Sequence, residues 1–183
     1  MGCKDSDAYL QASLYAYKLE PSADAAVGCA AMAFKKGDID GSVKFFDEAI
    51  NLETDNAKKA DNAYKAASVL ASAKKLSQAR SYAQKAISFN ENFGAPYILI
   101  AQLYAGNYKW NDEPALNKCT FFAAIDKLQR AKAVDPSVAE EANKLISSYS
   151  AYTPEAKDLF MLGYKAGDRI TIGGWIGETT TIR

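Results

Sequence analysis

Four alanines recur along the chain at nearly regular intervals, each followed three residues later by a large apolar residue, and this repetition limits the fold more than any other feature. The pairs are Ala16/Leu19, Ala49/Leu52, Ala86/Phe89 and Ala131/Val134. Successive alanines are separated by 33, 37 and 45 residues. A period of about 34 residues, with insertions in the later copies, is the spacing of repeated helical hairpins in which each pair of antiparallel helices packs on the next.

The amino-acid composition is that of a folded chain with balanced charge. Of its 183 residues, 49% are hydrophobic and 24% are charged, which is enough for one compact domain or a short solenoid. Lys plus Arg equal Asp plus Glu at 22 each, so no net charge draws the chain to phosphate backbones. No apolar run approaches the roughly 20 residues that span a bilayer. We therefore expect neither a nucleic-acid partner nor a membrane span.

Side chains suited to catalysis or metal binding are scarce. Histidine is absent, which removes the commonest metal ligand and the usual acid–base group near neutral pH. Cys3, Cys29 and Cys119 form no C-x-x-C pair, and the chain has no G-x-S-x-G motif or phosphate-binding loop. The sequence therefore predicts no catalytic residue, no metal site and no cofactor.

The clearest hairpin is expected in residues 23–56. Small residues at three- and four-residue spacings form an apolar stripe on its first helix, so that a neighbouring helix can approach closely. These residues are Ala26, Cys29, Ala30 and Ala33. Gly37 follows where the first helix must end and turn, because glycine accepts a positive φ without a steric penalty. The second helix is expected to bury Ser42, Phe46, Ala49, Ile50 and Leu52.

The same arrangement returns twice before the pattern changes. After residue 137 an amphipathic segment predicts a capping helix, and alternating residues near the end predict two short strands around Gly173 to Gly177. The expected segments are the second helix of a truncated repeat at 1–22, repeats at 23–56, 57–92 and 93–137, capping helices at 138–165 and a β-hairpin tail at 166–183. The third repeat carries a turn-rich insertion at 105–118.

The N-terminal segment is out of phase with these repeats. Residues 9–21 match a second helix, yet too few residues precede them to supply its partner. We therefore expect the C-terminal part of a longer protein, with the helix at 7–19 covered by a preceding repeat or by a second copy in a homodimer. Met1-Gly2-Cys3 fits the pattern for N-myristoylation, with Cys3 as a palmitoylation site. We favour an accidental match, and lipidation is the alternative.

The repeated pattern resembles the tetratricopeptide repeat, whose frame reads W-x2-L-G-x2-Y, then A-x3-F, then A and P. The second helices match it best, as Ser42-x3-Phe46-x2-Ala49, Ala79-x3-Ala83-x2-Ala86 and Ala124-x3-Leu128-x2-Ala131. The chain departs from the frame in that no Trp opens a repeat, and Thr54 and Glu91 stand where the closing proline is usual. The resemblance implies an all-α fold, a tetratricopeptide-repeat solenoid of helical hairpins, here followed by the capping helix and the short terminal β-hairpin.

A finer resemblance covers residues 23–183. The long insertion, the run at 131–137 and the ending at 174–183 are similar to those of tetratricopeptide repeat proteins from Bacteroides-type bacteria. Those proteins are generally longer and exported, which implies a bacterial cell-envelope setting, periplasmic or on the surface. No catalytic residue comes with this family.

Peptides commonly lie along the concave face of such a solenoid, which the first helices of the repeats form. The repeat frame places Val27, Ala31, Phe34, Tyr64, Ser68, Ile98 and Gln102 on that face. In this family, the clamp that binds chaperone tails uses Lys, Asn and Arg to bind the C-terminal carboxylate. These positions lack those residues, which argues against acidic chaperone tails as ligands. For Phe34 and Tyr64, packing between repeats is an equally acceptable role.

Tyr108, Trp110 and Cys119 in or beside the insertion form a second candidate site. Exposed aromatic residues on a loop held by a rigid scaffold often serve recognition. We favour the alternative that Tyr108 and Trp110 fold back as a small core beneath the loop. Trp175 is expected to pack against the capping helix.

Three classes of function follow from these observations. A non-catalytic scaffold that binds a protein or peptide is favoured, because repeat solenoids present extended surfaces and no group here is arranged for catalysis. A structural self-assembly element of the cell envelope is the first alternative. An enzyme is the second, and the sequence disfavours it.

Overall fold

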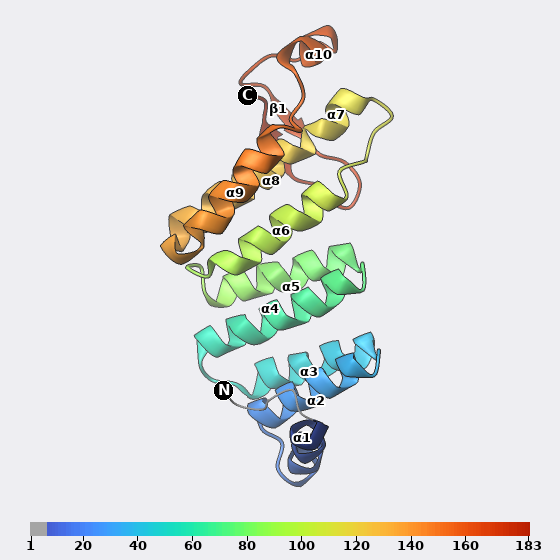
Figure 1. Cartoon of the computed structure of the whole chain (residues 1–183), viewed down its shortest axis with the longest axis vertical. Coiled ribbons are helices and arrows are strands. Elements are labelled where there is room, and N and C mark those ends of the chain that lie inside the picture. The colour runs from blue at the N-terminus through green and yellow to red at the C-terminus, as the bar shows by residue number, and fades with distance from the viewer. Residues whose placement is uncertain (1–6) are drawn as a thin grey trace. The chain divides into compact units, whose positions relative to one another are not determined.

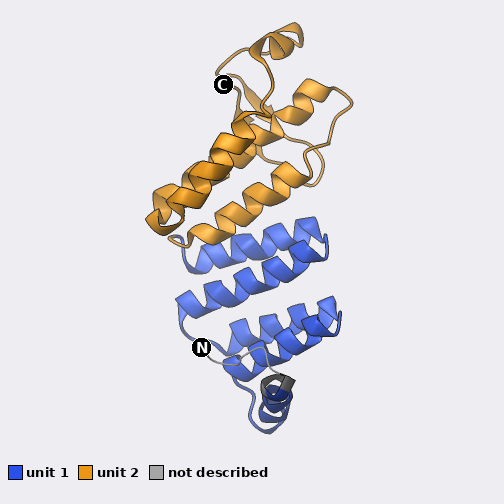
Figure 2. Ribbon diagram, viewed as in Figure 1, with its two compact units in different colours: residues 1–91 blue, residues 92–183 orange. Residues whose placement is uncertain are grey.

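The computed structural model describes residues 7–183 and divides the chain into two compact units, residues 1–91 and 92–183 (Figure 2). In the described residues of the first unit, all regular secondary structure is helical. Its helices are α1 (Asp7–Leu19), α2 (Ala23–Lys35), α3 (Ile39–Leu52), α4 (Asn56–Ser72) and α5 (Leu76–Phe89). Figure 1 shows α2 with α3 and α4 with α5 as antiparallel pairs, and α1 packs against α2.

Alanine side chains lie where these helices meet. Ala49 in α3 and Ala86 in α5 are fully buried, as are Ala63 and Ala66 in α4, whereas Leu52 at the end of α3, which was predicted to be buried, is exposed. Ala86 packs with Ala63 and with Ile50 of the preceding hairpin in one cluster. Because a methyl group is the whole side chain at these points, the helix backbones come close and little volume remains for a larger residue.

The two hairpins of this unit turn in the same way with different residues. Gly37 has φ 77° after α2, and Lys74 has φ 58° after α4. In each turn the following backbone N–H reaches back to the helix, from Asp38 to the carbonyl of Ala33 and from Lys75 to that of Leu70, both at 2.9 Å. The predicted glycine turn at residue 37 is present, and Lys74 adopts a left-handed conformation that lysine disfavours.

Polar contacts join the successive hairpins at their second helices. The Asp47 carboxylate in α3 accepts hydrogen bonds from the Tyr82 hydroxyl at 2.5 Å and from Lys85 Nζ at 3.0 Å, both in α5. Burial, and then this bond to Asp47, raise the pKa of Tyr82 above its ordinary value. The tyrosine therefore stays protonated and donates the bond throughout the physiological range.

The helix α1 is held to the first hairpin on one side. The ring of Tyr17 lies edge-on to that of Phe45 with centroids 5.6 Å apart, and its hydroxyl donates to Glu48 in α3. On another part of α1, Tyr15 and Leu19 are 67% and 70% exposed. The helix thus packs on its own hairpin and still presents large apolar side chains to solvent.

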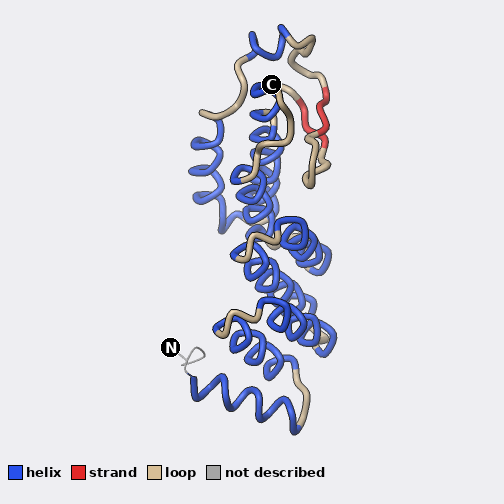
Figure 3. The backbone as a smooth tube through the Cα atoms, turned by 90° about the vertical axis from the view of Figure 1, so that its right-hand side faces the viewer, coloured by secondary structure: helices blue, strands red, loops and turns tan. Residues whose placement is uncertain are grey.

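The second unit combines helices with a short sheet. Its elements are α6 (Gly94–Gly106), α7 (Pro114–Lys118), α8 (Thr120–Val134), a 3₁₀ turn (Pro136–Val138), α9 (Ala139–Ser150), α10 (Ala156–Met161), β1 (Arg169–Thr171) and β2 (Thr179–Thr181). Here α6 pairs with α8, and α9 packs on α8 as the predicted capping helix. The strands pair antiparallel with Ile170 opposite Thr180 (Figure 3). The prediction of an all-α helical-hairpin fold with a capping helix and a terminal β-hairpin is confirmed.

Side chains of α8 form polar contacts with the β-hairpin of β1 and β2. Thr180 donates to Asp126 Oδ2 at 2.6 Å, and Lys127 pairs with Glu178 at 2.9 Å. The C-terminal Arg183 also pairs with Asp126. A two-stranded hairpin is marginal alone, so these contacts and the burial of Ile170, Ile172 and Ile182 hold it in place.

We predict that Ala86→Leu lowers the free energy of unfolding by about 1–3 kcal/mol, because the added methylenes overfill the contact with Ile50 and Ala63. Ala57→Leu, at an exposed position of α4, is the matched control and should change stability by less than about 0.5 kcal/mol. Urea unfolding followed by circular dichroism measures both. Equal stability of the two variants would show that α5 does not pack tightly at Ala86.

Candidate functional site

A groove of about 380 Å³ lies in the first unit between its first helices α2 and α4. One side consists of Val27, Gly28 and Ala31 from α2. The other consists of Lys58, Asp61, Asn62 and Lys65 from α4, and Asp24, Phe46 and Glu53 complete the lining. The groove therefore has a wall of small residues facing a wall of polar ones.

The wall from α2 follows from the helical spacing of small residues. Val27 and Ala31 are four residues apart and lie on one face, with Gly28 buried beside them. The Ser22 hydroxyl fixes the start of this helix by accepting the backbone N–H of Ala25 at 3.3 Å. No side chain longer than valine projects from these three positions, so the groove stays open to a ligand backbone.

The wall from α4 has a regular helical spacing too. Lys58, Asp61, Asn62 and Lys65 stand at positions i, i+3, i+4 and i+7, which share one face of a helix. Asp55 caps the helix by accepting the backbone N–H of Lys58 at 3.0 Å. The cap fixes where α4 begins and so aims this polar face at the groove.

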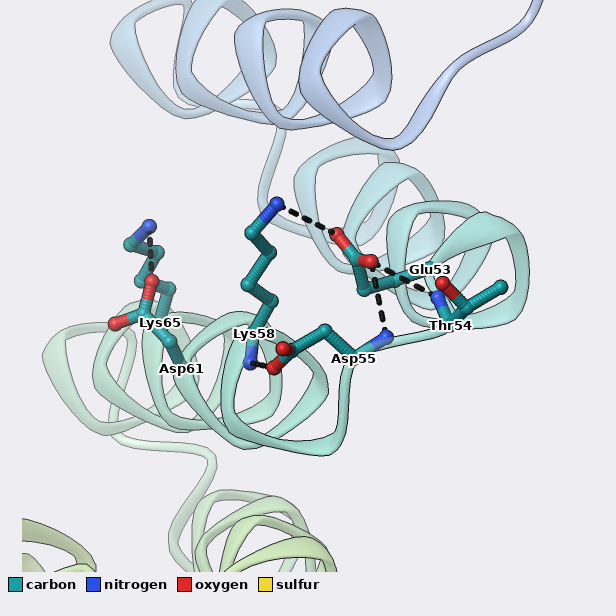
Figure 4. Close-up of polar contacts among 6 residues, drawn as sticks. All are labelled: Glu53, Thr54, Asp55, Lys58, Asp61 and Lys65. Atoms are coloured by element: carbon teal, nitrogen blue, oxygen red, sulfur yellow. Dashed lines mark hydrogen bonds and ion pairs between the residues drawn. The ribbon is translucent and has the colours of Figure 1, made fainter.

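Charges of both signs line the groove, and both of its lysines are paired with carboxylates (Figure 4). Lys65 and Asp61 are joined at 2.6 Å, whereas Lys58 and Glu53 are farther apart at 3.9 Å. The Glu53 carboxylate also accepts the backbone N–H groups of Thr54 at 2.9 Å and Asp55 at 3.1 Å. These two bonds, with a smaller effect of Lys58, hold the pKa of Glu53 below its usual value. Glu53 therefore stays ionised and does not suit the role of a general acid.

Asn62 differs from its neighbours because its carboxamide is unpaired and open to the groove. The residue as a whole is 5% exposed and lines the groove, and its carboxamide forms no hydrogen bond with any residue from 7 to 183. Its polar atoms are not fully enclosed, unlike Ser42 Oγ and Trp110 Nε1, which are buried without a partner among the described residues. A donor and an acceptor are therefore available together at the floor of the groove.

The residues predicted for the concave face of the first unit divide into two groups. Val27 and Ala31 line the groove. Phe34 is exposed near the end of α2 and lies outside the groove lining. Tyr64 packs against the cluster of Ile50, Ala63 and Ala86, and the Ser68 hydroxyl donates to the carbonyl of Tyr64 at 3.0 Å within the same helix. Tyr64 thus has the packing role that was the alternative reading of its position.

The second unit contains a separate cavity of about 430 Å³ between α6, the insertion and α9. Its lining includes Gln102 from the predicted concave face and Tyr108 from the insertion. Ile98 is buried within the unit and does not line this cavity. Three tyrosine rings surround Phe121, with centroid distances of 5.4 Å for Tyr108, 5.9 Å for Tyr149 and 5.5 Å for Tyr152.

The insertion is held by one asparagine. Asn117 in α7 accepts the backbone N–H groups of Trp110 at 2.7 Å and Asn111 at 2.8 Å, and donates to the Asn111 carbonyl at 2.7 Å. The ring of Trp110 covers Gly173 so closely that an added Cβ there would lie 2.7 Å from it. Trp110 therefore belongs to a small core beneath the loop, whereas Tyr108 borders the cavity.

The expectation for Cys119 needs correction. Cys119 is fully buried rather than displayed by the insertion, and burial raises the pKa of its thiol to about 11. It is therefore protonated and unreactive near neutral pH. The ring of Trp175, for which packing against the capping helix is expected, lies edge-on to Tyr104 of α6 at 5.7 Å between centroids. Met1, Gly2 and Cys3, which carry the lipidation pattern, lie outside the described residues.

Residues 7–183 contain neither a candidate metal site nor a candidate membrane span. Within that range, no three Cys, Asp or Glu side chains are grouped closely enough to hold a metal ion. In the same part of the chain, no helix has the length and apolar character that a membrane crossing requires.

Sequence reasoning missed the polar wall of the groove. Lys58, Asp61, Asn62 and Lys65 carry a usable signal, since their spacing marks one helical face. The burial of Asn62 leaves no signal in the sequence, because it depends on how α2 and α4 pack.

Comparison with known proteins gives the fold but no family. No family model matches the chain, and no curated protein sequence matches it. Two crystal structures of MamA, a protein of tetratricopeptide-repeat fold, are similar. The first is 15% identical with a TM-score of 0.55 and covers 85% of this chain and 86% of that one. The second is 16% identical with a TM-score of 0.54 and covers 81% and 79%. At these identities the likeness shows a tetratricopeptide-repeat-like fold alone.

Proposed function

We propose that this chain is a non-catalytic scaffold that binds an extended peptide segment of a partner protein in the groove between α2 and α4. The carboxamide of Asn62, which is unpaired and open to the groove, carries this proposal. An extended peptide presents one N–H donor and one C=O acceptor at each residue. A carboxamide offers the complementary pair, so Asn62 can bind the N–H and the C=O of one residue in an extended segment, which point to the same side.

The two walls of the groove suit the rest of such a ligand. The small residues Val27, Gly28 and Ala31 let a backbone approach α2 and contact short apolar side chains. Across from them, the paired charges of Asp61 and Lys65 give polar contacts that set the direction of the segment. The affinity then comes from the backbone, and the specificity from side chains at the two walls.

The same groove is poorly suited to catalysis. Four of its five charged side chains form ion pairs, and the one shifted carboxyl, Glu53, has a lowered pKa. A general acid or base needs a pKa near the working pH. This favours binding over chemistry as the role of the site.

For the protein as a whole, we propose a cell-envelope setting in a bacterium. The support is the sequence of residues 174–183 together with the long insertion, which resemble exported proteins of Bacteroides-type bacteria. Fractionation of the native cells is the test, and recovery of the protein only in the cytosol would contradict this setting.

We predict that Asn62→Ala weakens peptide binding about tenfold or more, because a hydrogen bond to a buried group contributes roughly 1–3 kcal/mol when its loss leaves the other partner unpaired. The ligands are peptides selected from a random displayed library against the wild-type chain, and calorimetry measures their affinity. Asn51→Ala, which removes an exposed carboxamide from α3, is the matched control and should leave the affinity unchanged.

Two results would contradict the groove as the binding site. One is a selection that yields no peptide with measurable affinity for the wild-type chain. The other is a set of peptides whose affinity is the same for the wild-type chain and for Asn62→Ala, with Val27→Glu also without effect.

Self-assembly is a second candidate function, and the exposed side chains of α1 favour it. Tyr15 and Leu19 are 67% and 70% exposed, and exposed apolar residues of this size often mark contacts between proteins. A twofold pairing of α1 helices would cover both. We predict that the wild-type chain dimerises at high concentration and that a Tyr15→Ser/Leu19→Ser variant does not.

Analytical ultracentrifugation measures this association. Leu52→Ser, at an exposed leucine of α3, is the matched control and should dimerise as the wild-type chain does. A wild-type chain that stays monomeric at millimolar concentration would exclude the contact.

A further inference from the structure

The cavity of the second unit has aromatic walls. Phe121 lies at its base, and the rings of Tyr108, Tyr149 and Tyr152 stand within 6 Å of it, centroid to centroid. Tyr152 stacks on Phe121 and is nevertheless 58% exposed, so part of its side chain remains accessible. An aromatic group entering here would meet rings on several sides, at the distances that aromatic pairs favour.

The size of the cavity fits one large side chain and its neighbour. Its volume of about 430 Å³ lies within the range of roughly 300–1,000 Å³ for ligand pockets. The wall from α6 consists of Ala105 and Gly106, which leave room opposite the rings, together with Gln102. Gln102 and the tyrosine hydroxyls supply hydrogen-bonding groups at the edge of an otherwise apolar surface.

One charged residue lines the cavity, and it is a lysine. Lys118 is exposed and forms no ion pair with any described residue. Glu155 is close enough for Lys118 to affect it, but its carboxylate is bound to Lys157 at 2.9 Å, and Lys157 is the main cause of its lowered pKa. Lys118 therefore remains available to an anion, and it would repel a cationic ligand, which the aromatic rings alone would attract.

We propose that this cavity binds an aromatic side chain that lies next to a carboxylate in a segment of a partner protein. The ring enters among Tyr108, Phe121, Tyr149 and Tyr152, and the carboxylate pairs with Lys118. This site is distinct from the groove between α2 and α4 and does not depend on it. A protein segment fits the open mouth, because Gln102 can bind the backbone on either side of the inserted ring.

A set of four hexapeptides tests the proposal. The first is acetyl-Ser-Gly-Phe-Asp-Gly-Ser-amide, and the others replace its Asp with Asn, its Asp with Lys, or its Phe with Ala. Binding to the full chain is followed by NMR titration. We expect the Phe-Asp peptide to bind best, the Asn peptide about fivefold more weakly, the Lys peptide more weakly still, and the Ala peptide not measurably.

Charge reversal supplies the sharper test. Lys118→Glu should make the Phe-Lys peptide bind better than the Phe-Asp peptide. Lys109→Glu makes the same change on an exposed lysine of the insertion that does not line the cavity, and it should preserve the original order. Asn62→Ala should also preserve it, which separates this site from the proposed groove.

Three outcomes would overturn the proposal. The first is equal binding of the Asp, Asn and Lys peptides, and the second is an unchanged order of affinities in Lys118→Glu. The third is binding of free 3-phenylpropionate as tightly as the Phe-Asp peptide, which would make the ligand a small aromatic acid rather than a protein segment.

Discussion

The close approach of paired helices through alanine is the contact on which the rest of this structure depends. Ala49, Ala86 and Ala131 are fully buried in the second helices of the three hairpins, and the first helices meet them with equally small residues such as Ala63. A methyl group at the contact gives short interhelical distances and tight packing with few rotamers to order. The larger apolar residues then fill the spaces beside these contacts, as Ile50 does next to Ala86.

Because the hairpins need only small residues at their contacts, other faces of the first helices are free to form sites. In the first unit, Ala31 lines a groove whose opposite wall is polar. In the second unit, Gln102 occupies the corresponding repeat position and lines a cavity whose opposite wall is aromatic. One repeated backbone thus presents two different chemistries, and the difference comes from the facing elements, α4 in one unit and the insertion with α9 in the other.

The fold could be predicted from sequence because its determinants are local and periodic. The alanine spacing, Gly37 and the alternating residues near the end identify hairpins, turn and strands within short windows. The sites depend on longer contacts. Trp110 lies over Gly173, far along the chain, and Asn62 matters only because α2 and α4 bury it. Tyr64 shows the same limit, since its position in the frame allowed two roles and packing against Ile50 and Ala86 decides between them.

The central claim is that the groove between α2 and α4 binds an extended peptide through Asn62. The most direct measurement is an NMR titration of the isotope-labelled chain with the tightest peptide from the selection. The account predicts that the side-chain amide signals of Asn62 shift most, together with the backbone amides of Gly28 and Ala31. Shifts confined to exposed positions of the second helices, such as Lys44 and Gln84, with the Asn62 signals unchanged, would contradict it.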